Sequence, residues 1–154
     1  MIRLATAADA DGLLVLMCKL AKFEGYADRF AVTASDLIER GLDEKGANQF
    51  TAWIADEGGV FAGYAVVYTI PFTYDLRPTA VLKELFVDER ARNAGLGTQL
   101  FAAVSDYARR QNARLLRWQV LPANEAAKGF YRREGCELET EWESWVLAVE
   151  RIEM

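Results

Sequence analysis

The sequence predicts an α+β fold in a single domain, residues 1–154, with helices around one mixed β-sheet. Short apolar runs bounded by turn residues, which are typical of strands, occur along the chain. Between them lie segments whose apolar residues recur every three or four positions, as they do on one face of a helix. The sequence contains no repeat, linker or low-complexity segment. The expected order of elements is βααβββαβαββ.

The first third of the chain predicts one strand and two helices. The strand is residues 2–4. Thr6 and Thr33 are each followed three positions later by an acid, a pattern that starts helices. The apolar residues expected on the buried faces of these helices are Leu13, Leu14, Leu16, Met17 and Leu20, then Leu37, Ile38 and Leu42. Residues 22–26, which combine aromatic and acidic side chains, are expected to be a loop.

The middle of the chain predicts three strands. Residues 50–55 and 60–70 flank the turn signal Asp56-Glu57-Gly58-Gly59 and should form a hairpin. Residues 71–78 form a second loop with aromatic and acidic residues, and the next strand ends at Val87.

The last third predicts two helices and three strands. A helix should follow residues 92–98 and end near Gln111, and residues 115–120 should form a strand. A second helix, residues 125–133, begins after Pro122-Ala123-Asn124 and stops at Gly135. Two closing strands are expected at residues 136–140 and 145–152.

The composition excludes several kinds of chemistry. The 154 residues include no histidine, which removes Ser-His-Asp and Cys-His nucleophiles and the histidine base. Cys18 and Cys136 lie far apart, so no metal site is expected. A net charge of −5 argues against binding nucleic acid and is compatible with a small cation. We find no membrane-spanning run and no signal-peptide pattern, and expect a cytoplasmic protein.

The most informative segment is Arg92-Asn93-Ala94-Gly95-Leu96-Gly97-Thr98, which joins a strand to a helix. Such a turn leaves backbone N–H groups free at the positive end of a helix, where phosphates bind. Arginines flank it, its small residues allow close approach, and Thr98 adds a hydroxyl. A simple packing turn is the alternative. The glycine spacing fits neither a P-loop nor a dinucleotide fingerprint.

Several charged or aromatic residues are candidates for chemistry. Glu84 lies inside an apolar strand, where a charge usually has a partner or a role. Its neighbour Lys83 should point to the other face of that strand. Glu24 and Asp75 are either surface acids or parts of a site. Tyr131 is either a packing residue or a functional one.

The chain resembles the GNAT superfamily of acetyl-coenzyme-A-dependent N-acetyltransferases over essentially its whole length. Leu85-Phe86-Val87 followed by the segment from Arg92 to Gly97 looks like the family's pyrophosphate-binding motif, R/Q-x-x-G-x-G/A. Asn124 with Phe130-Tyr131-Arg132-Arg133 is similar to its second motif. Within the superfamily the chain looks most like the diamine (spermidine/spermine-type) acetyltransferases, because of the segments Leu20-Ala21-Lys22-Phe23-Glu24 and Phe72-Thr73-Tyr74-Asp75.

The resemblance implies the GNAT fold, acetyl-coenzyme A as co-substrate, no metal and a homodimer. The residues that it implies for binding coenzyme A are Leu85, Phe86, Val87, Arg92, Asn93, Ala94, Gly95, Leu96, Gly97, Thr98, Asn124 and Ala127. Those that it implies for binding substrate are Phe23, Glu24, Tyr74, Asp75 and Lys83. Lys83 stands where the diamine enzymes carry an acid, and a lysine there would suit a substrate that bears a carboxylate.

The implied reaction is direct transfer of acetyl to a primary amine of a small molecule, a diamine, polyamine or basic amino acid. Tyr131 matches the family's general acid. The base is Glu84, with Glu24, Asp75 or an ordered water as alternatives. Two other functions stay open at this point: a protein lysine or N-terminal acetyltransferase, and a non-catalytic acyl-coenzyme-A sensor.

Overall fold

The computed structural model describes residues 1–150, which fall into two compact units, Met1–Gln119 and the residues from Val120 on. The strands are β1 (Ile2–Leu4), β2 (Thr51–Glu57), β3 (Val60–Ile70), β4 (Thr79–Val87) and β5 (Leu115–Arg117). The α-helices are α1 (Ala10–Glu24), α2 (Ala34–Leu37, which continues as a π-helical turn over Ile38–Leu42), α3 (Leu96–Arg110) and α4 (Glu125–Arg133). No helix in this described part of the chain is long and apolar enough to span a membrane.

The five strands form one sheet in the order β1-β2-β3-β4-β5. Neighbouring strands are antiparallel except β4 and β5, which are parallel, so the predicted mixed sheet is confirmed. The β2–β3 hairpin turns at Gly58 and Gly59, whose φ angles are 68° and 92°. Two successive positive φ angles match the twist of paired strands, and glycine adopts them without strain.

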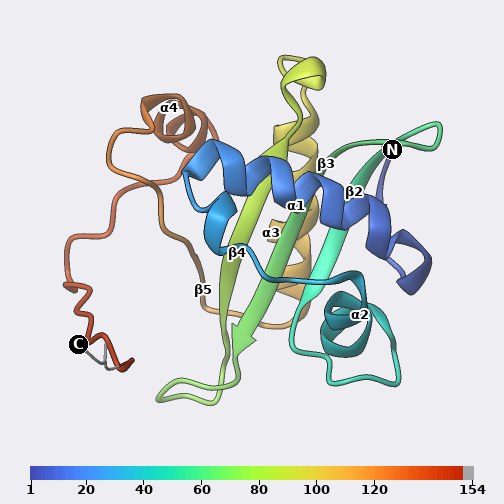
Figure 1. The fold of residues 1–154 in the computed structure, drawn as a ribbon. Helices are drawn as coiled ribbons and strands as arrows, with labels where there is room; N and C mark the ends of the chain where they lie inside the picture. Colours follow the sequence, from blue (N-terminus) through green and yellow to red (C-terminus); the bar gives the residue numbers. More distant parts are fainter. Residues whose placement is uncertain (151–154) are drawn as a thin grey trace. The chain divides into compact units, whose positions relative to one another are not determined.

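Helices cover both faces of this sheet. In Figure 1, α1 and α2 lie in front of the sheet and α3 lies behind it. The buried residues between α1, α2 and the front of the sheet include Leu13, Leu16, Leu20, Leu37, Tyr64, Val66 and Phe86. On the α3 side, the rings of Trp53 and Tyr107 meet edge to face with centroids 5.1 Å apart.

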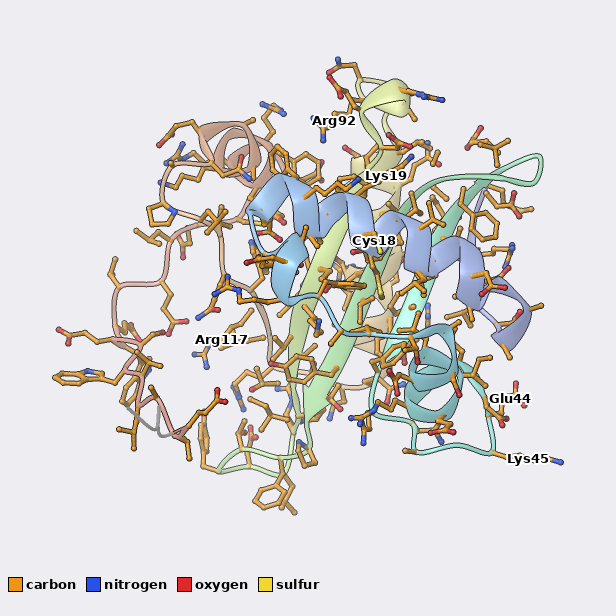
Figure 2. The ribbon with its side chains drawn as sticks, in the orientation of Figure 1. Cys18, Lys19, Glu44, Lys45, Arg92 and Arg117 are labelled. Carbon is orange, nitrogen blue, oxygen red and sulfur yellow. The ribbon has the colours of Figure 1, made fainter. Side chains whose placement is uncertain are left out.

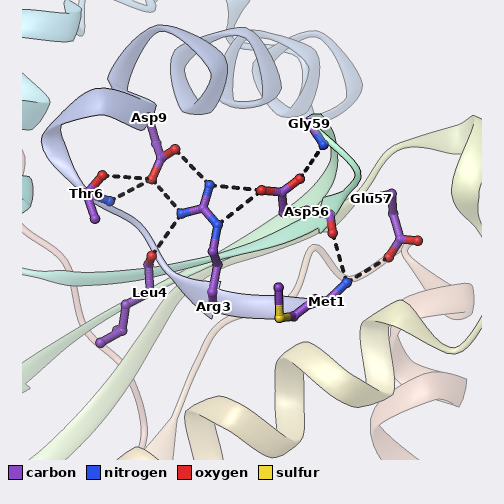
Figure 3. A network of polar contacts seen from close by, with 8 residues as sticks. All are labelled: Met1, Arg3, Leu4, Thr6, Asp9, Asp56, Glu57 and Gly59. Carbon is purple, nitrogen blue, oxygen red and sulfur yellow. Dashed lines mark hydrogen bonds and ion pairs between the residues drawn. The ribbon is translucent and has the colours of Figure 1, made fainter.

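Arg3 joins the first strand to the start of α1 and to the β2–β3 hairpin (Figure 3). Its guanidinium contacts Asp9 at 2.8 and 2.9 Å and Asp56 at 3.0 Å. The Asp9 carboxylate also accepts from the backbone N–H of Thr6 at 2.8 Å, and Asp56 accepts from that of Gly59 at 2.8 Å. One arginine therefore ties three elements together through hydrogen bonds strengthened by charge.

Two local predictions about this unit are wrong. Residues 22–26 are not all loop, because α1 continues to Glu24 and ends at Gly25, whose φ of 85° provides the left-handed cap. The predicted strand 115–120 is shorter, because β5 pairs with β4 only from Thr79–Leu115 to Val81–Arg117. Beyond Val81, the β5-facing edge of β4 has no strand partner among the described residues.

The second unit contains α4, with the bounds predicted from its caps. The Asn124 side chain accepts a hydrogen bond from the N–H of Ala127 at 3.1 Å, and Gly135 has a φ of 84° just after the helix. The predicted closing strands are absent from residues 136–150. A strand needs a paired neighbour, and the described residues of this unit offer none. The end of the second predicted strand, Ile152, lies outside the described residues.

Candidate functional site

The turn after β4 has the geometry of an anion site. Asn93 and Gly95 have φ angles of 68° and 79°, and Gly95 caps the start of α3. The first helical hydrogen bond runs from the Gln99 N–H to the Gly95 carbonyl at 3.1 Å. The N–H groups before Gln99 therefore lie outside the helical ladder, and the first turn of α3 contains no acid that would repel an anion.

Arg92 connects this turn to the end of α1. Its Nε donates to the Val87 carbonyl at 3.1 Å, and its guanidinium lies 5.6 Å from the centre of the Phe23 ring. A second link joins Lys19 of α1 to Asp88 at 2.6 Å. Figure 2 labels Lys19 on α1 and Arg92 in the turn that follows β4. The last turns of α1 therefore lie beside the phosphate turn.

Glu84 is held between two partners on the α1 side of the sheet. The hydroxyl of Tyr64, a fully buried residue, donates to Glu84 Oε2 at 3.0 Å. The Lys83 ammonium contacts Glu84 Oε1 at 2.9 Å. The Glu84 side chain is 12% exposed and that of Lys83 is 55% exposed. The carboxylate is thus fixed from inside by tyrosine and reached from outside by lysine.

The ion pair corrects the expectation that Lys83 points away from Glu84. The register of β3 and β4 shifts between Val66 and Val67, because Val66 pairs with Glu84 whereas Val67 pairs with Leu82. Lys83 is the extra residue of a β-bulge, and a bulge breaks the alternation of side chains between the two faces. Lys83 and Glu84 can therefore reach each other although they are adjacent in sequence.

Glu24 and Tyr26, at the end of α1, are coupled electrostatically to Glu84. Burial raises the pKa of Glu24, the negative charge of Glu84 raises it further, and Lys83 opposes the shift. Burial and then the charges of Glu84 and Glu24 also raise the pKa of Tyr26. We call the five residues Glu24, Tyr26, Tyr64, Lys83 and Glu84 the Glu84 cluster.

The pKa of Tyr64 is raised far above its ordinary value, by burial first and then by the charge and hydrogen bond of Glu84. Tyr64 therefore stays a neutral hydrogen-bond donor to Glu84 at physiological pH. A carboxylate fixed in this way, whose second oxygen faces an exposed lysine, can take up a proton from a bound ammonium group.

Tyr74 and Asp75 lie in the loop at the other end of β4. Asp75 forms an ion pair with Arg114 and accepts from the Thr73 hydroxyl at 2.7 Å. The Arg114 guanidinium also lies 5.2 Å from the centre of the Tyr74 ring. This loop meets the sheet at Thr79, five residues before Glu84, a distance of roughly 17 Å along a strand. Glu24 therefore lies within electrostatic reach of Glu84, whereas Asp75 lies at the far end of β4.

The remaining candidates, Asn124, Ala127 and Tyr131, belong to the second unit. Asn124 and Ala127 form the N-terminal cap of α4. Tyr131 is near the end of that helix, and its ring meets that of Phe130 edge to face at 5.2 Å. Asn124 thus serves as the N-cap that its place before the helix predicts, and its role in binding coenzyme A and the role of Tyr131 stay predictions.

Sequence reasoning missed Tyr64 and left Tyr26 without a role. Tyr64 looks like a packing residue in an apolar strand, and its partner Glu84 follows 20 residues later. No local signal in the sequence marks this pair, because the two side chains meet only through the register of β3 and β4, which pairs Tyr64 with Phe86 and Val66 with Glu84.

Elsewhere in the described part of the chain we find no second cluster of reactive side chains. No group of three or more Cys, Asp or Glu residues within 1–150 is arranged to hold a metal ion. A cavity of about 380 Å³ lies beside α1 and is lined by Ala8, Gly12, Val15, Leu16, Lys19, Gly59 and Phe61. These residues include no acid or nucleophile other than Lys19, which is paired with Asp88.

The chain matches one protein family and several proteins with acetyltransferase names. The profile of the acetyltransferase (GNAT) family matches residues 17–136. The uncharacterized N-acetyltransferase YhfO of Bacillus subtilis (strain 168) is 32% identical over 96 residues, covering 62% of this chain and 64% of that protein. The thialysine N-epsilon-acetyltransferase of Bos taurus is 27% identical over 151 residues, covering 94% of this chain and 88% of that protein. The chain thus spans just under two thirds of the first relative and most of the second.

A third relative and two solved structures extend the comparison. The human spermidine/spermine N(1)-acetyltransferase-like protein 1 is 28% identical, covering 95% of this chain and 22% of that protein. A probable acetyltransferase of known structure has a TM-score of 0.82 at 23% identity, covering 98% of this chain and 99% of that chain. A soil-metagenome aminoglycoside acetyltransferase in complex with sisomicin has a TM-score of 0.81 at 17% identity, covering 97% of this chain and 96% of that chain. The two structures show that the fold is the one predicted.

Proposed function

Because this chain belongs to the acetyltransferase (GNAT) family, and is therefore an acetyl-transferring enzyme, we propose that its acceptor is a primary amine of a small molecule. The amine belongs to a diamine, a polyamine or a basic amino acid. The observation that carries the proposal is the pairing, on one strand, of an anion-binding turn with a carboxylate. Glu84 lies on β4, and the phosphate turn begins where β4 ends.

The residues of the phosphate turn fit the diphosphate of coenzyme A, the donor that the family generally uses. Gly95, with its φ of 79° and no side chain, leaves the backbone open to a ligand, and Arg92 supplies a positive charge. The turn that we assign to the diphosphate is Arg92, Asn93, Ala94, Gly95, Leu96, Gly97 and Thr98. The free edge of β4, Leu85 to Val87, offers backbone hydrogen bonds to an extended ligand.

Glu84 is the proposed base. An alkyl amine has a pKa near 10, so at pH 7 about one molecule in a thousand carries the lone pair that attacks a thioester. Tyr64 fixes one oxygen of Glu84, and the other faces Lys83 at the partly exposed side of the cluster. Glu24 is the alternative base, because it is the last residue of α1, lies within electrostatic reach of Glu84 and has a raised pKa. Asp75 is paired with Arg114 at the other end of β4, so we do not propose it as the base, and its role in binding substrate stays a prediction.

Two further groups complete the proposed reaction. Backbone N–H groups near Phe86 and Val87 stabilise the oxyanion that forms as the amine attacks the thioester carbon. The leaving thiolate has a conjugate thiol of pKa about 8.5, so a general acid adds only a modest acceleration. Tyr131 is the proposed acid, on the basis of the family resemblance.

Two relatives support a small amine as acceptor. Their names specify thialysine and spermidine or spermine, and all of these are amines of low molecular mass. The aromatic and acidic residues Phe23, Glu24 and Tyr26 at the end of α1 suit a small cation, because they combine negative charge with ring faces.

A thiol-release assay with acetyl-coenzyme A and a panel of amines tests the proposal. The panel contains a monoamine, diamines, polyamines, lysine analogues and lysine-containing peptides. Saturable release with one or more small amines supports the proposed acceptor. Release with peptides alone assigns the protein-acetyltransferase function instead, and no release with any acceptor leaves the acyl-coenzyme-A sensor as the better account.

A further inference from the structure

Lys83 is the unusual member of the Glu84 cluster. Regular alternation along β4 would direct its side chain to the other face of the sheet. The bulge at Lys83 instead lets its ammonium contact Glu84 Oε1 at 2.9 Å. Lys83 is much more exposed than Glu84, 55% against 12%, so its ammonium can leave the carboxylate at little cost.

The charges of the cluster do not balance. The Lys83 ammonium contacts Glu84, the Glu24 carboxylate feels the charges of both groups, and the two tyrosines are neutral, so these five groups sum to a net charge of −1. One further positive charge neutralises the cluster. Without Lys83 the same groups would sum to −2 and would be neutralised by two positive charges.

We propose that Lys83 is a specificity-determining residue that acts as a resident counter-ion of Glu84, so that the site favours one substrate ammonium and disfavours a second. This inference rests on the proposed function, because it assumes that the acceptor amine enters beside Glu84. The first ammonium pairs with the carboxylates and yields its proton to the base. A second ammonium on the same short molecule meets Lys83 and is repelled.

Two consequences follow for the acceptor. Compact dications such as short diamines bind less well, relative to monoamines, than they would beside an unpaired Glu84. A neutral or anionic group next to the amine suits Lys83, because the lysine can turn from Glu84 to that group. The preference depends on charge rather than on shape, and salt therefore weakens it.

The experiment compares the binding of two ligands of equal chain length, butylamine and 1,4-diaminobutane, by titration calorimetry in the presence of coenzyme A. The proteins are the wild type, Lys83→Gln and Lys83→Glu. Lys45→Glu is the matched control, because Lys45 is exposed and lies in the loop before β2, away from the cluster (Figure 2). Thermal unfolding checks that each variant is folded.

The ratio of diamine to monoamine affinity should rise by several fold in Lys83→Gln and by about tenfold in Lys83→Glu, and the rise should shrink at high salt. Lys45→Glu should leave the ratio within about twofold of the wild type. If Lys83→Glu does not fold, the affinity ratio of the neutral variant Lys83→Gln tests the inference.

An unchanged ratio in the Lys83 variants, or an equal rise in the Lys45 control, overturns the inference. The binding ratio needs no turnover, so its outcome is separate from the thiol-release assay. A wild type that releases no thiol with any amine contradicts the proposed function, whereas an unchanged binding ratio contradicts only the role of Lys83.

Discussion

Replacing Asp9 by asparagine removes the carboxylate that holds Arg3 at the start of α1 (Figure 3). The hydrogen bonds from Arg3 lower the pKa of Asp9 from 3.8 to about 2, in spite of an opposing effect of burial. A carboxyl whose pKa is lower in the folded state stabilises the fold above its unfolded pKa. This stabilisation is lost as the pH falls from about 4 through about 2.

The size of the effect follows from that shift. At about 1.4 kcal/mol per unit, the shift corresponds to about 2 kcal/mol at pH 7. The Arg3 side chain is 32% exposed, and screening by solvent reduces the expected loss to about 1–2 kcal/mol. For a chain of 154 residues this is a fall of roughly 3–6 °C in Tm.

Urea unfolding of the wild type and Asp9→Asn at pH 7 and pH 3 measures this contribution. The difference in unfolding free energy should shrink by about half at pH 3, because the carboxyl is then mostly protonated in the unfolded chain. Asp28→Asn is the control, since Asp28 is an exposed acid outside the network. The reasoning would be refuted if Asp9→Asn lost the same unfolding free energy at both pH values, or lost no more than Asp28→Asn does.

Three predictions concern the site. Gly95→Val should lower the affinity for coenzyme A at least tenfold by calorimetry, because a branched side chain is strained at a φ of 79°. Gly58→Val is the control: it is strained in the same way but lies in the β2–β3 turn, so it should leave the affinity for coenzyme A unchanged. Glu84→Gln should lower turnover by about a hundredfold with coenzyme A affinity retained, and undiminished turnover would assign the base elsewhere. Tyr131→Phe should reduce turnover by about tenfold, the modest effect expected for a thiolate leaving group, and rates equal to those of the wild type at every pH would remove its role as acid.

Local signals predicted the elements whose ends are fixed by a few neighbouring residues. The β2–β3 hairpin follows from Gly58 and Gly59, which adopt φ angles that other residues avoid. The bounds of α4 follow from Asn124, whose side chain caps the first turn, and from Gly135, whose positive φ ends the helix. At the end of α1 the signal was present in Gly25, but the aromatic and acidic residues before it suggested a loop.

Features that depend on pairing between distant segments could not be predicted. The bulge at Lys83 depends on how β4 aligns with β3, and a shift of one residue changes which side chains share a face. The hydrogen bond from Tyr64 to Glu84 depends on the same alignment. The apolar pattern of residues 136–150 resembles strands, but a strand forms only where a neighbour accepts its backbone hydrogen bonds.

The central claim is that this chain transfers acetyl from coenzyme A to the nitrogen of a small amine, with Glu84 as base. The most direct measurement is NMR or mass spectrometry of the products formed from isotope-labelled acetyl-coenzyme A and the amine panel. The claim predicts a labelled N-acetyl amine that forms with the wild type and is strongly reduced with Glu84→Gln. Labelled acetate alone, or a labelled amine formed equally by both proteins, would contradict it.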